Sequence, residues 1–159
     1  MDLTIIVAVS ENNVIGNNNQ IPWRISQDLK RFKELTLNHP VIMGRKTYES
    51  IPEKFRPLPK RKNIILSNTM QPSDGIYVAR NIEEALKLAE DQDTYVAGGR
   101  AVYELFLPKA NIIELTRVHK NYDGDTFFPE LDLTKWNLVD KEEHLEQDIP
   151  YSFLTYLKK

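Results

Sequence analysis

The chain has 159 residues, 41% of them hydrophobic and 28% charged, and no cysteine. This composition is typical of a globular domain with a sizeable core and excludes disordered and fibrous classes, while the lack of cysteine excludes disulfides, thiolate catalysis and Cys-ligated zinc. The net charge of −2 gives no reason to expect nucleic acid or an anionic membrane as a partner. Because the N-terminus has no signal-peptide pattern and no apolar run approaches the ~18 residues of a membrane helix, we expect one cytoplasmic domain spanning residues 1–159.

The first predicted strand covers residues 4–9 and is followed by a polar loop rich in asparagine, by Trp23 and by a helix over 26–37, for which Ser26 is the predicted cap. Asp28 then lies in the first turn of the helix, beside Trp23 and the end of the strand. A carboxylate in such a cleft can hold or transfer a proton. The alternative is that Asp28 only complements the helix dipole, the commoner reason for an acid at this position, and that Trp23 only packs in the core.

Short apolar runs alternate with helical segments over the first two thirds of the chain. The predicted strands are 4–9, 40–44, 63–67, 76–79 and 94–98, and the predicted helices are 26–37, 45–51 and 81–91, the last with capping-box spacing between Asn81 and Glu84. Continuous apolar strands are covered on both faces, so this order predicts an α/β fold with a parallel sheet. After residue 108 the segments 112–119, 135–145 and 150–159 predict longer strands that end one edge of the sheet as an antiparallel hairpin.

Several common active-site patterns are missing from the sequence. The three histidines are not at metal-ligand spacing, so no metal site is expected. There is also no GxSxG nucleophile motif, no GxxxxGK[ST] phosphate-binding loop and no GxGxxG fingerprint. The last absence excludes the usual dinucleotide motif but not dinucleotide binding as such.

Two junctions between a strand and a helix are candidate anion sites. The first is Gly44 followed by Arg45, Lys46 and Thr47, and the second is Gly98-Gly99 followed at once by a helix. Exposed amides and cationic side chains at such junctions favour phosphate, although every α/β fold has tight turns there. Two junctions at the carboxyl ends of parallel strands favour a ligand with a pyrophosphate and a further phosphate.

Six motifs resemble, in this order, those of bacterial dihydrofolate reductases: VIGNNNQIPWRISQDLKRFK, PVIMGRKTYESI, RPLPKRKNIILS, YVAGGRAVYELFLPKA, IELTRVH and GDTFFPE. Together they span nearly the entire chain. The resemblance implies a single-domain, three-layer α/β fold with a mostly parallel eight-stranded sheet, an antiparallel C-terminal edge and four main helices. It also implies NADPH-dependent reduction of 7,8-dihydrofolate to 5,6,7,8-tetrahydrofolate, by hydride transfer to C6 and protonation of N5, in one-carbon metabolism. The implied partners are dihydrofolate and antifolate-type inhibitors, and the implied state is a monomer.

The resemblance also implies the substrate residues. Asp28 matches the acid that binds the pterin edge, Thr116 the threonine that hydrogen-bonds this acid, and Trp23 the tryptophan linked to it through water, so these three are the implied catalytic residues. Taken alone, Thr116 is simply a β-branched residue in a strand. The full implied substrate set is Ile6, Val7, Ala8, Asp28, Phe32, Ile51, Leu58, Arg61 and Thr116, with Arg61 clamping the carboxylate of the glutamate tail.

On the cofactor side, Arg45 and Lys46 match the positions that recognise the 2′-phosphate of NADPH. The loop over 10–24 matches the mobile loop that closes over nicotinamide, Asp125 matches the residue that holds this loop through its backbone near 17–19, and the Gly98-Gly99 peptide is implied to be cis. The full implied cofactor set is Ala8, Ile15, Ile21, Gly44, Arg45, Lys46, Thr47, Leu66, Ser67, Asn68, Arg80, Ala97, Gly98, Gly99, Arg100, Ala101, Val102 and Tyr103.

The chain departs from the family pattern at four places. Ala97 stands where a larger Ile or Val is usual, Arg100 where Gly or Ala is frequent, and Ile21 where Leu or Met is usual, and three extra residues lie near 52–55. The alternatives are a reductase of the same fold that acts on another heterocycle, such as a pyrimidine of riboflavin synthesis, and a non-catalytic module that binds nucleotides or, through the basic loop 54–62, RNA.

Overall fold

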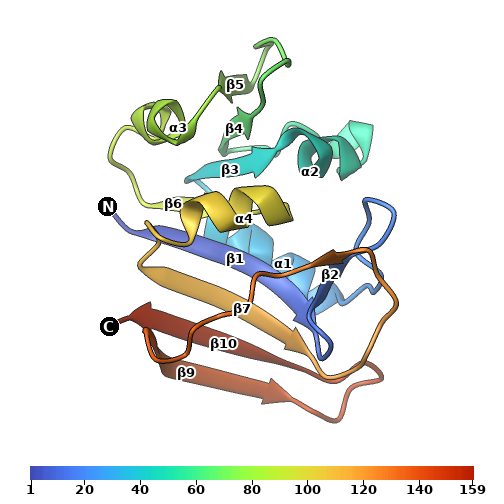
Figure 1. The fold of residues 1–159 in the computed structure, drawn as a ribbon. Helices are drawn as coiled ribbons and strands as arrows, with labels where there is room; N and C mark the ends of the chain where they lie inside the picture. Colours follow the sequence, from blue (N-terminus) through green and yellow to red (C-terminus); the bar gives the residue numbers. More distant parts are fainter.

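An eight-stranded sheet runs through the computed structural model, which describes residues 1–159, in the order β5-β4-β3-β6-β1-β7-β10-β9 (Figure 1). The strands from β5 to β7 pair in parallel, and β10 pairs antiparallel with both β7 and β9. The predicted α/β fold with an antiparallel C-terminal edge is therefore confirmed. The strands are β1 (Leu3–Ser10), β3 (Pro40–Gly44), β4 (Lys62–Leu66), β5 (Ile76–Ala79), β6 (Thr94–Val96), β7 (Ile112–Val118), β9 (Trp136–His144) and β10 (Tyr151–Lys158).

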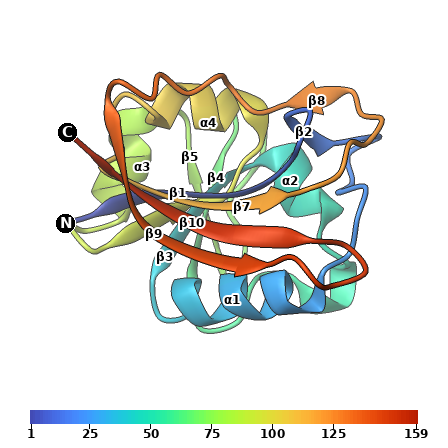
Figure 2. The ribbon, with the colours of Figure 1, turned by 90° about the horizontal axis from the view of Figure 1, so that it is seen from below.

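Helices cover both faces of this sheet, as the resemblance implied. They are α1 (Ser26–Thr36), α2 (Arg45–Ser50), α3 (Ile82–Leu88) and α4 (Arg100–Phe106), with one 3₁₀ turn, η1 (Glu53–Phe55). Figure 2 shows α1 on one side of the sheet and α3 and α4 on the other. None of these helices has the length and apolarity needed to cross a membrane.

The alternation of side chains along β1 explains the two layers. Successive strand residues point to opposite faces, and Ile5, Val7 and Val9 pack in the main core with residues of α3 and α4, among them Phe106. The even-numbered residues of β1 therefore face the layer of α1. In β3, which β6 separates from β1, Met43 packs with Tyr48 of α2 in a separate cluster on that second face.

Helix α1 is held to the sheet with little apolar burial. Thr36 is its one buried residue, and Leu29 is 47% exposed. The helix begins at Ser26, but its N-cap is Ile25, so the prediction that Ser26 is the cap is wrong. Ile25 is buried in a cluster with Trp23, and this packing, rather than a side-chain hydrogen bond, fixes the start of the helix.

Other predicted boundaries shift by a few residues. The strand predicted over 94–98 ends at Val96, before the backbone bends into the Gly98 turn, where φ is +113°. Helix α3 is shorter than predicted because Glu90 and Asp91 adopt positive φ. Its cap, Asn81, accepts a hydrogen bond from the Glu84 amide as a capping box requires, but the Glu84 carboxylate binds the amide of Arg80 rather than that of Asn81.

A second, two-stranded sheet was not predicted. It pairs β2 (Val14–Gly16) with β8 (Thr126–Phe127) in antiparallel order. Val14 is fully buried, and a Cβ atom on Gly124 would overlap its side chain, so the lack of a side chain at Gly124 allows this contact. The first half of the loop over 10–24 is therefore anchored to the β7–β8 connection.

Candidate active site

Asp28 and Thr116 meet between α1 and β7, near the carboxyl ends of the parallel strands. Thr116 Oγ1 donates a hydrogen bond of 2.6 Å to Asp28 Oδ1. Thr116 is buried and lies in register between Ala8 of β1 and Phe153 of β10. The hydrogen bond implied by the resemblance is therefore present, and Asp28 Oδ2 has no hydrogen-bond partner among the protein side chains.

Burial raises the pKa of the Asp28 carboxyl above its ordinary value. The hydrogen bond from Thr116 and the positive charge of Arg31 act in the opposite direction, but they do not cancel the effect of burial. A carboxyl group with a raised pKa in a cleft is a candidate for proton handling near neutral pH. This electrostatic feature separates Asp28 from an ordinary first-turn acid, whose charge the helix dipole would favour.

The predicted substrate residues on β1 and α1 differ in burial and in the face of the sheet that they occupy. Ile6 and Val7 of β1 are buried and Ala8 is partly buried, whereas Phe32 of α1 is only partly covered. By alternation along β1, Ile6 and Ala8 point to the Asp28 side, but Val7 packs in the opposite core. Val7 can therefore approach a substrate only with its backbone. Trp23 is buried, and its ring lies 5.0 Å from that of Tyr122.

The basic loop places Arg61 at the C-terminal end of α1. Arg61 Nη1 donates to Thr36 Oγ1 at 3.1 Å, and its Nε donates to the Pro59 carbonyl at 3.0 Å. Partial burial lowers the pKa of this guanidinium, which still remains a cation at any pH of interest. Ile51 and Leu58 each pack against the cluster around Tyr48 of α2, and Leu58 lies three residues before Arg61 in the chain.

The two glycine junctions predicted as anion sites are in direct contact. The Gly44 amide donates to the Gly98 carbonyl at 2.7 Å, and the Gly98-Gly99 peptide bond is cis, as the resemblance implied. A Cβ atom on Gly99 would lie 3.3 Å from Thr47 Oγ1, and one on Gly44 would lie 3.2 Å from Val102 Cγ2. Glycine at these positions therefore lets the ends of β3 and β6 approach each other and leaves their backbone open to a ligand.

A cleft of about 750 Å³ extends from this junction across the ends of β4 and β5. Its lining includes most of the predicted cofactor residues: Gly44, Arg45, Lys46, Thr47, Leu66, Ser67, Asn68, Arg80, Gly99, Arg100, Ala101 and Val102. Six more lining residues were not predicted: Asn19, Asn81, Ile82, Glu83, Leu105 and Thr126. The capping motif at Asn81 was a usable signal, since it marks a third strand–helix junction at the same edge of the sheet.

Six predicted cofactor residues lie outside the lining of this cleft: Ala8, Ile15, Ile21, Ala97, Gly98 and Tyr103. Tyr103 is buried, and its hydroxyl donates to the Ile6 carbonyl at 2.8 Å. Ile15 packs against the main core, whereas Ile21 is 56% exposed. The cleft therefore accounts for the polar part of the predicted cofactor set, and a role for these six residues in cofactor binding stays a prediction.

Cations outnumber acids among the charged side chains that line the cleft. Arg45 bonds to Glu49 at 3.2 Å and to Thr69 Oγ1 at 3.0 Å, and Arg100 bonds to Glu104 at 2.6 Å. Arg80 donates to the Ser67 carbonyl at 2.8 Å. Each guanidinium is thus oriented by a partner on the protein, yet remains exposed to an incoming anion.

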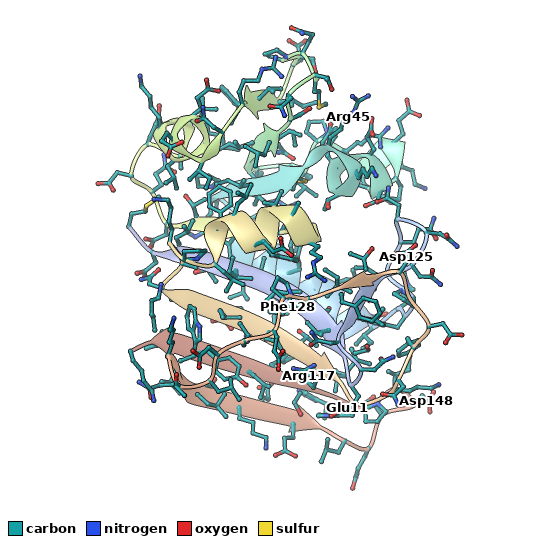
Figure 3. All side chains as sticks on the ribbon, viewed as in Figure 1. Glu11, Arg45, Arg117, Asp125, Phe128 and Asp148 are labelled. Atoms are coloured by element: carbon teal, nitrogen blue, oxygen red, sulfur yellow. The ribbon has the colours of Figure 1, made fainter.

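Asp125, in the turn before β8, contacts the loop over 10–24 at its middle. Its Oδ2 accepts a hydrogen bond of 3.0 Å from the Asn18 amide, and this bond is the main cause of its lowered pKa. Its own amide donates to the Gly16 carbonyl at 3.1 Å. Figure 3 shows Asp125 and Arg45 at the same end of the molecule, toward which β1, β3 and β7 run.

Comparisons with known proteins agree with this arrangement. Residues 2–158 match the model of the dihydrofolate reductase family. The chain is 42% identical to dihydrofolate reductase of Haemophilus influenzae over 93% of this chain and 91% of the relative, and 39% identical to that of Neisseria gonorrhoeae over 100% and 99%. A solved structure of dihydrofolate reductase from Enterococcus faecalis, complexed with NADP(H) and RAB-propyl, superposes with a TM-score of 0.90 at 32% identity, covering 99% of this chain and 96% of that one.

Replacing Asp28 by Asn should stabilise the fold at neutral pH. Because the pKa of Asp28 is raised in the folded state, the native protein binds more protons than the unfolded chain between the two pKa values. Its stability therefore falls as pH rises through this window and stays reduced above it. Urea unfolding from pH 4 to 8 should show that Asp28→Asn is more stable than wild type at pH 7. The difference in unfolding free energy should shrink as pH falls toward the pKa of an aspartate in the unfolded chain, about 3.9.

Asp132 provides a control of opposite sign. Hydrogen bonds from Thr134 lower its pKa, so Asp132→Asn should be less stable than wild type at pH 7 and approach it in acid. If Asp28→Asn is instead destabilised at pH 7 to the same extent as Asp132→Asn, burial does not govern the Asp28 carboxyl.

Proposed function

The chain belongs to the dihydrofolate reductase family, its reaction is the NADPH-dependent reduction of 7,8-dihydrofolate to 5,6,7,8-tetrahydrofolate, and we propose that Asp28 and Thr116 form the polar centre of its substrate site. The observation that carries this proposal is the 2.6 Å hydrogen bond between the two side chains, at a position where burial raises the pKa of the Asp28 carboxyl. Thr116 engages Oδ1 and thereby orients the carboxylate. Its Oδ2 is left to accept the N–H groups along one edge of a pterin, which a single carboxylate can hold with paired hydrogen bonds.

The reaction needs a hydride at C6, a proton at N5 and the exclusion of water. NADPH supplies the hydride when bound. We assign the supply of this proton to Asp28. Its raised pKa keeps the carboxyl group protonated at a pH nearer to neutral than an exposed carboxyl group would be. Trp23, packed beside the start of α1, closes the pocket against bulk solvent.

For the tail of the substrate we propose Arg61. Its guanidinium is held by Thr36 and by the Pro59 carbonyl, which leaves Nη2 and its face toward solvent for the α-carboxylate of the glutamate group. We assign Ile51, Leu58 and Phe32 to the apolar walls of the site between Arg61 and Asp28. This order of groups, acid, apolar walls and cation, matches the order of pterin, aromatic ring and carboxylate along dihydrofolate.

For NADPH we propose the cationic cleft. Arg45 and Lys46 take the 2′-phosphate, and the backbone at Gly98-Gly99, with Thr47 and Arg100, takes the pyrophosphate. The close approach of Gly44 and Gly98 keeps the backbone accessible there, and Ser67 and Arg80, joined by a hydrogen bond, lie on the adenosine side.

The direct test of function is to follow NADPH oxidation with dihydrofolate by ultraviolet absorbance. The wild type should turn over, and Asp28→Asn should lose most of its kcat/KM at pH 7 while unfolding cooperatively. The loss should shrink as pH falls, because protons from solvent replace part of the role of the carboxyl. Asp132→Asn is the matched control and should retain activity; full activity of Asp28→Asn would remove Asp28 from the proposal.

The cofactor proposal predicts a strong preference for NADPH over NADH. A charge-assisted hydrogen bond contributes about 1.5–3 kcal/mol, so wild-type kcat/KM should favour NADPH more than tenfold, and Arg45→Gln should reduce this ratio by about tenfold while leaving NADH kinetics unchanged. Lys54→Gln removes a cation in η1, outside the cleft, and should leave the ratio intact. Equal losses with both cofactors would mean that Arg45 does not recognise the 2′-phosphate.

We propose that Asp125 holds the loop over 10–24 closed during hydride transfer, because its carboxylate bonds to the Asn18 amide at an exposed position. Asp125→Ala should slow the hydride step, measured in single turnovers with deuterated NADPH, and leave substrate affinity nearly unchanged. Because the pKa of Asp125 is lowered in the folded state, the variant should also lose some unfolding free energy at pH 7, as Asp132→Asn does. An unaltered hydride rate in this variant would assign the contact to local turn structure alone.

A further inference from the structure

We propose that an ion pair between Arg31 of α1 and Glu114 of β7 positions Asp28 and sets the electrostatic potential at its carboxyl group. This inference rests on the proposed role of Asp28 in the substrate site. Arg31 and Glu114 are positioning residues in this proposal, since they act on the reaction through Asp28.

The ion pair is short and partly buried. Arg31 Nη2 lies 2.7 Å from Glu114 Oε2, and the two side chains are 22% and 14% exposed. Thr155 of β10 donates a hydrogen bond of 2.8 Å to the same oxygen, and the Arg31 guanidinium carbon stands 4.5 Å from the centre of the Phe153 ring. Arg31 is therefore held on three sides, by β7, by β10 and by its own helix.

The spacing of the partners couples this pair to Asp28. Asp28 and Arg31 are three residues apart on α1 and so share a helix face, separated by about 4.5 Å along the axis. Thr116 and Glu114 are two residues apart on β7, on the same face of the sheet and about 6.6 Å apart. The helix thus makes two polar contacts with one strand, in antiparallel order, and two such contacts fix both its rotation and its position along the strand.

Polar contacts are decisive here because α1 has little apolar anchoring. Thr36, at its far end, is its one buried residue. Near Asp28, Leu29 is largely exposed. Without the Arg31–Glu114 contact, the first turns of α1 would be held by the Thr116 hydrogen bond and by the packing of Ile25 before the helix. No second polar contact with β7 would then fix the position of the Asp28 carboxyl along the strand.

The charged surroundings of Asp28 give the pair an electrostatic effect as well. The groups that interact with Asp28 are Arg31 on its own helix, Tyr103 of α4 and Tyr151 of β10, and β1 carries no titratable side chain. Arg31 stabilises the ionised form of Asp28, while Glu114 on β7 balances Arg31. Removing Arg31 leaves an unpaired carboxylate near Asp28, and removing Glu114 leaves an unpaired cation, so the two changes act in opposite directions.

The experiment compares Arg31→Gln, Glu114→Gln and the double variant. The pKa of Asp28 is measured by carbon-13 NMR of its carboxyl, assigned through the signal lost in Asp28→Asn, and the pH dependence of the hydride step is measured in single turnovers. Arg31→Gln should raise the pKa of Asp28 and Glu114→Gln should lower it, each by about half a unit to one unit. The pH profile should follow, and the double variant should return close to wild type.

Lys30 and Glu34 are the matched control. They form an exposed pair 4.0 Å apart on the same helix, with side chains 69% and 65% exposed, so Lys30→Gln and Glu34→Gln change the same charges without facing the site and should leave the pKa of Asp28 unchanged. Arg31→Lys retains the charge and should also stay close to wild type. If Arg31→Gln fails to fold, Arg31→Met, which retains packing on Phe153, replaces it.

Shifts of the same sign in the two charge variants, or shifts no larger than those of the Lys30 and Glu34 variants, would overturn the inference, because general loosening of α1 would explain them. The NMR measurement does not depend on turnover. An unchanged pKa of Asp28 in a fully active enzyme therefore refutes this inference alone, whereas an active Asp28→Asn variant refutes the proposed role of Asp28.

Discussion

The contact between Thr116 and Asp28 is the constraint on which the substrate half of the molecule depends. It joins a helix with little apolar burial to a central strand of the sheet, and it holds a carboxyl group where burial raises its pKa. A fully apolar helix face would dock α1 more firmly, but it would remove the carboxyl group that we propose for recognition of the pterin. On this proposal, stability is given up at the position that function requires, which is common at active sites.

The sheet topology brings the two halves of the site together. Because β1, β3, β6 and β7 are parallel, their carboxyl ends lie at one edge of the sheet, where ligands of open α/β sheets bind. The hydrogen bond between Gly44 and Gly98 joins the ends of β3 and β6 on the proposed cofactor side. The register of Ala8 with Thr116 places the threonine that holds Asp28 on β7, directly beside β1. In the proposed site the cofactor and the substrate therefore approach each other near β1, whose side chains at its carboxyl end are small or apolar.

Much of this fold could be predicted from the sequence, because its strands are continuous apolar runs and its helices follow them directly. The pairing of β2 with β8 could not, since these strands have three and two residues and are joined by contacts between residues more than a hundred positions apart, such as Asn13 and Phe128. The Arg31–Glu114 pair spans 83 positions and has no local signature. What escaped prediction in both cases was a long-range polar contact.

The loop over 10–24 has two halves with different physical character. Its first half is anchored by the buried Val14 and by pairing with β8. Its second half is exposed over residues 18–21. This segment reaches the turn before β8 through the Asn18–Asp125 bond and α2 through the bond from Asn19 Nδ2 to the Lys46 carbonyl, 3.1 Å long. Single exposed hydrogen bonds break at low cost, so opening requires only the second half to move. Since this half touches two walls of the cofactor cleft, its movement can control access to the cleft while the anchored half keeps the pocket intact.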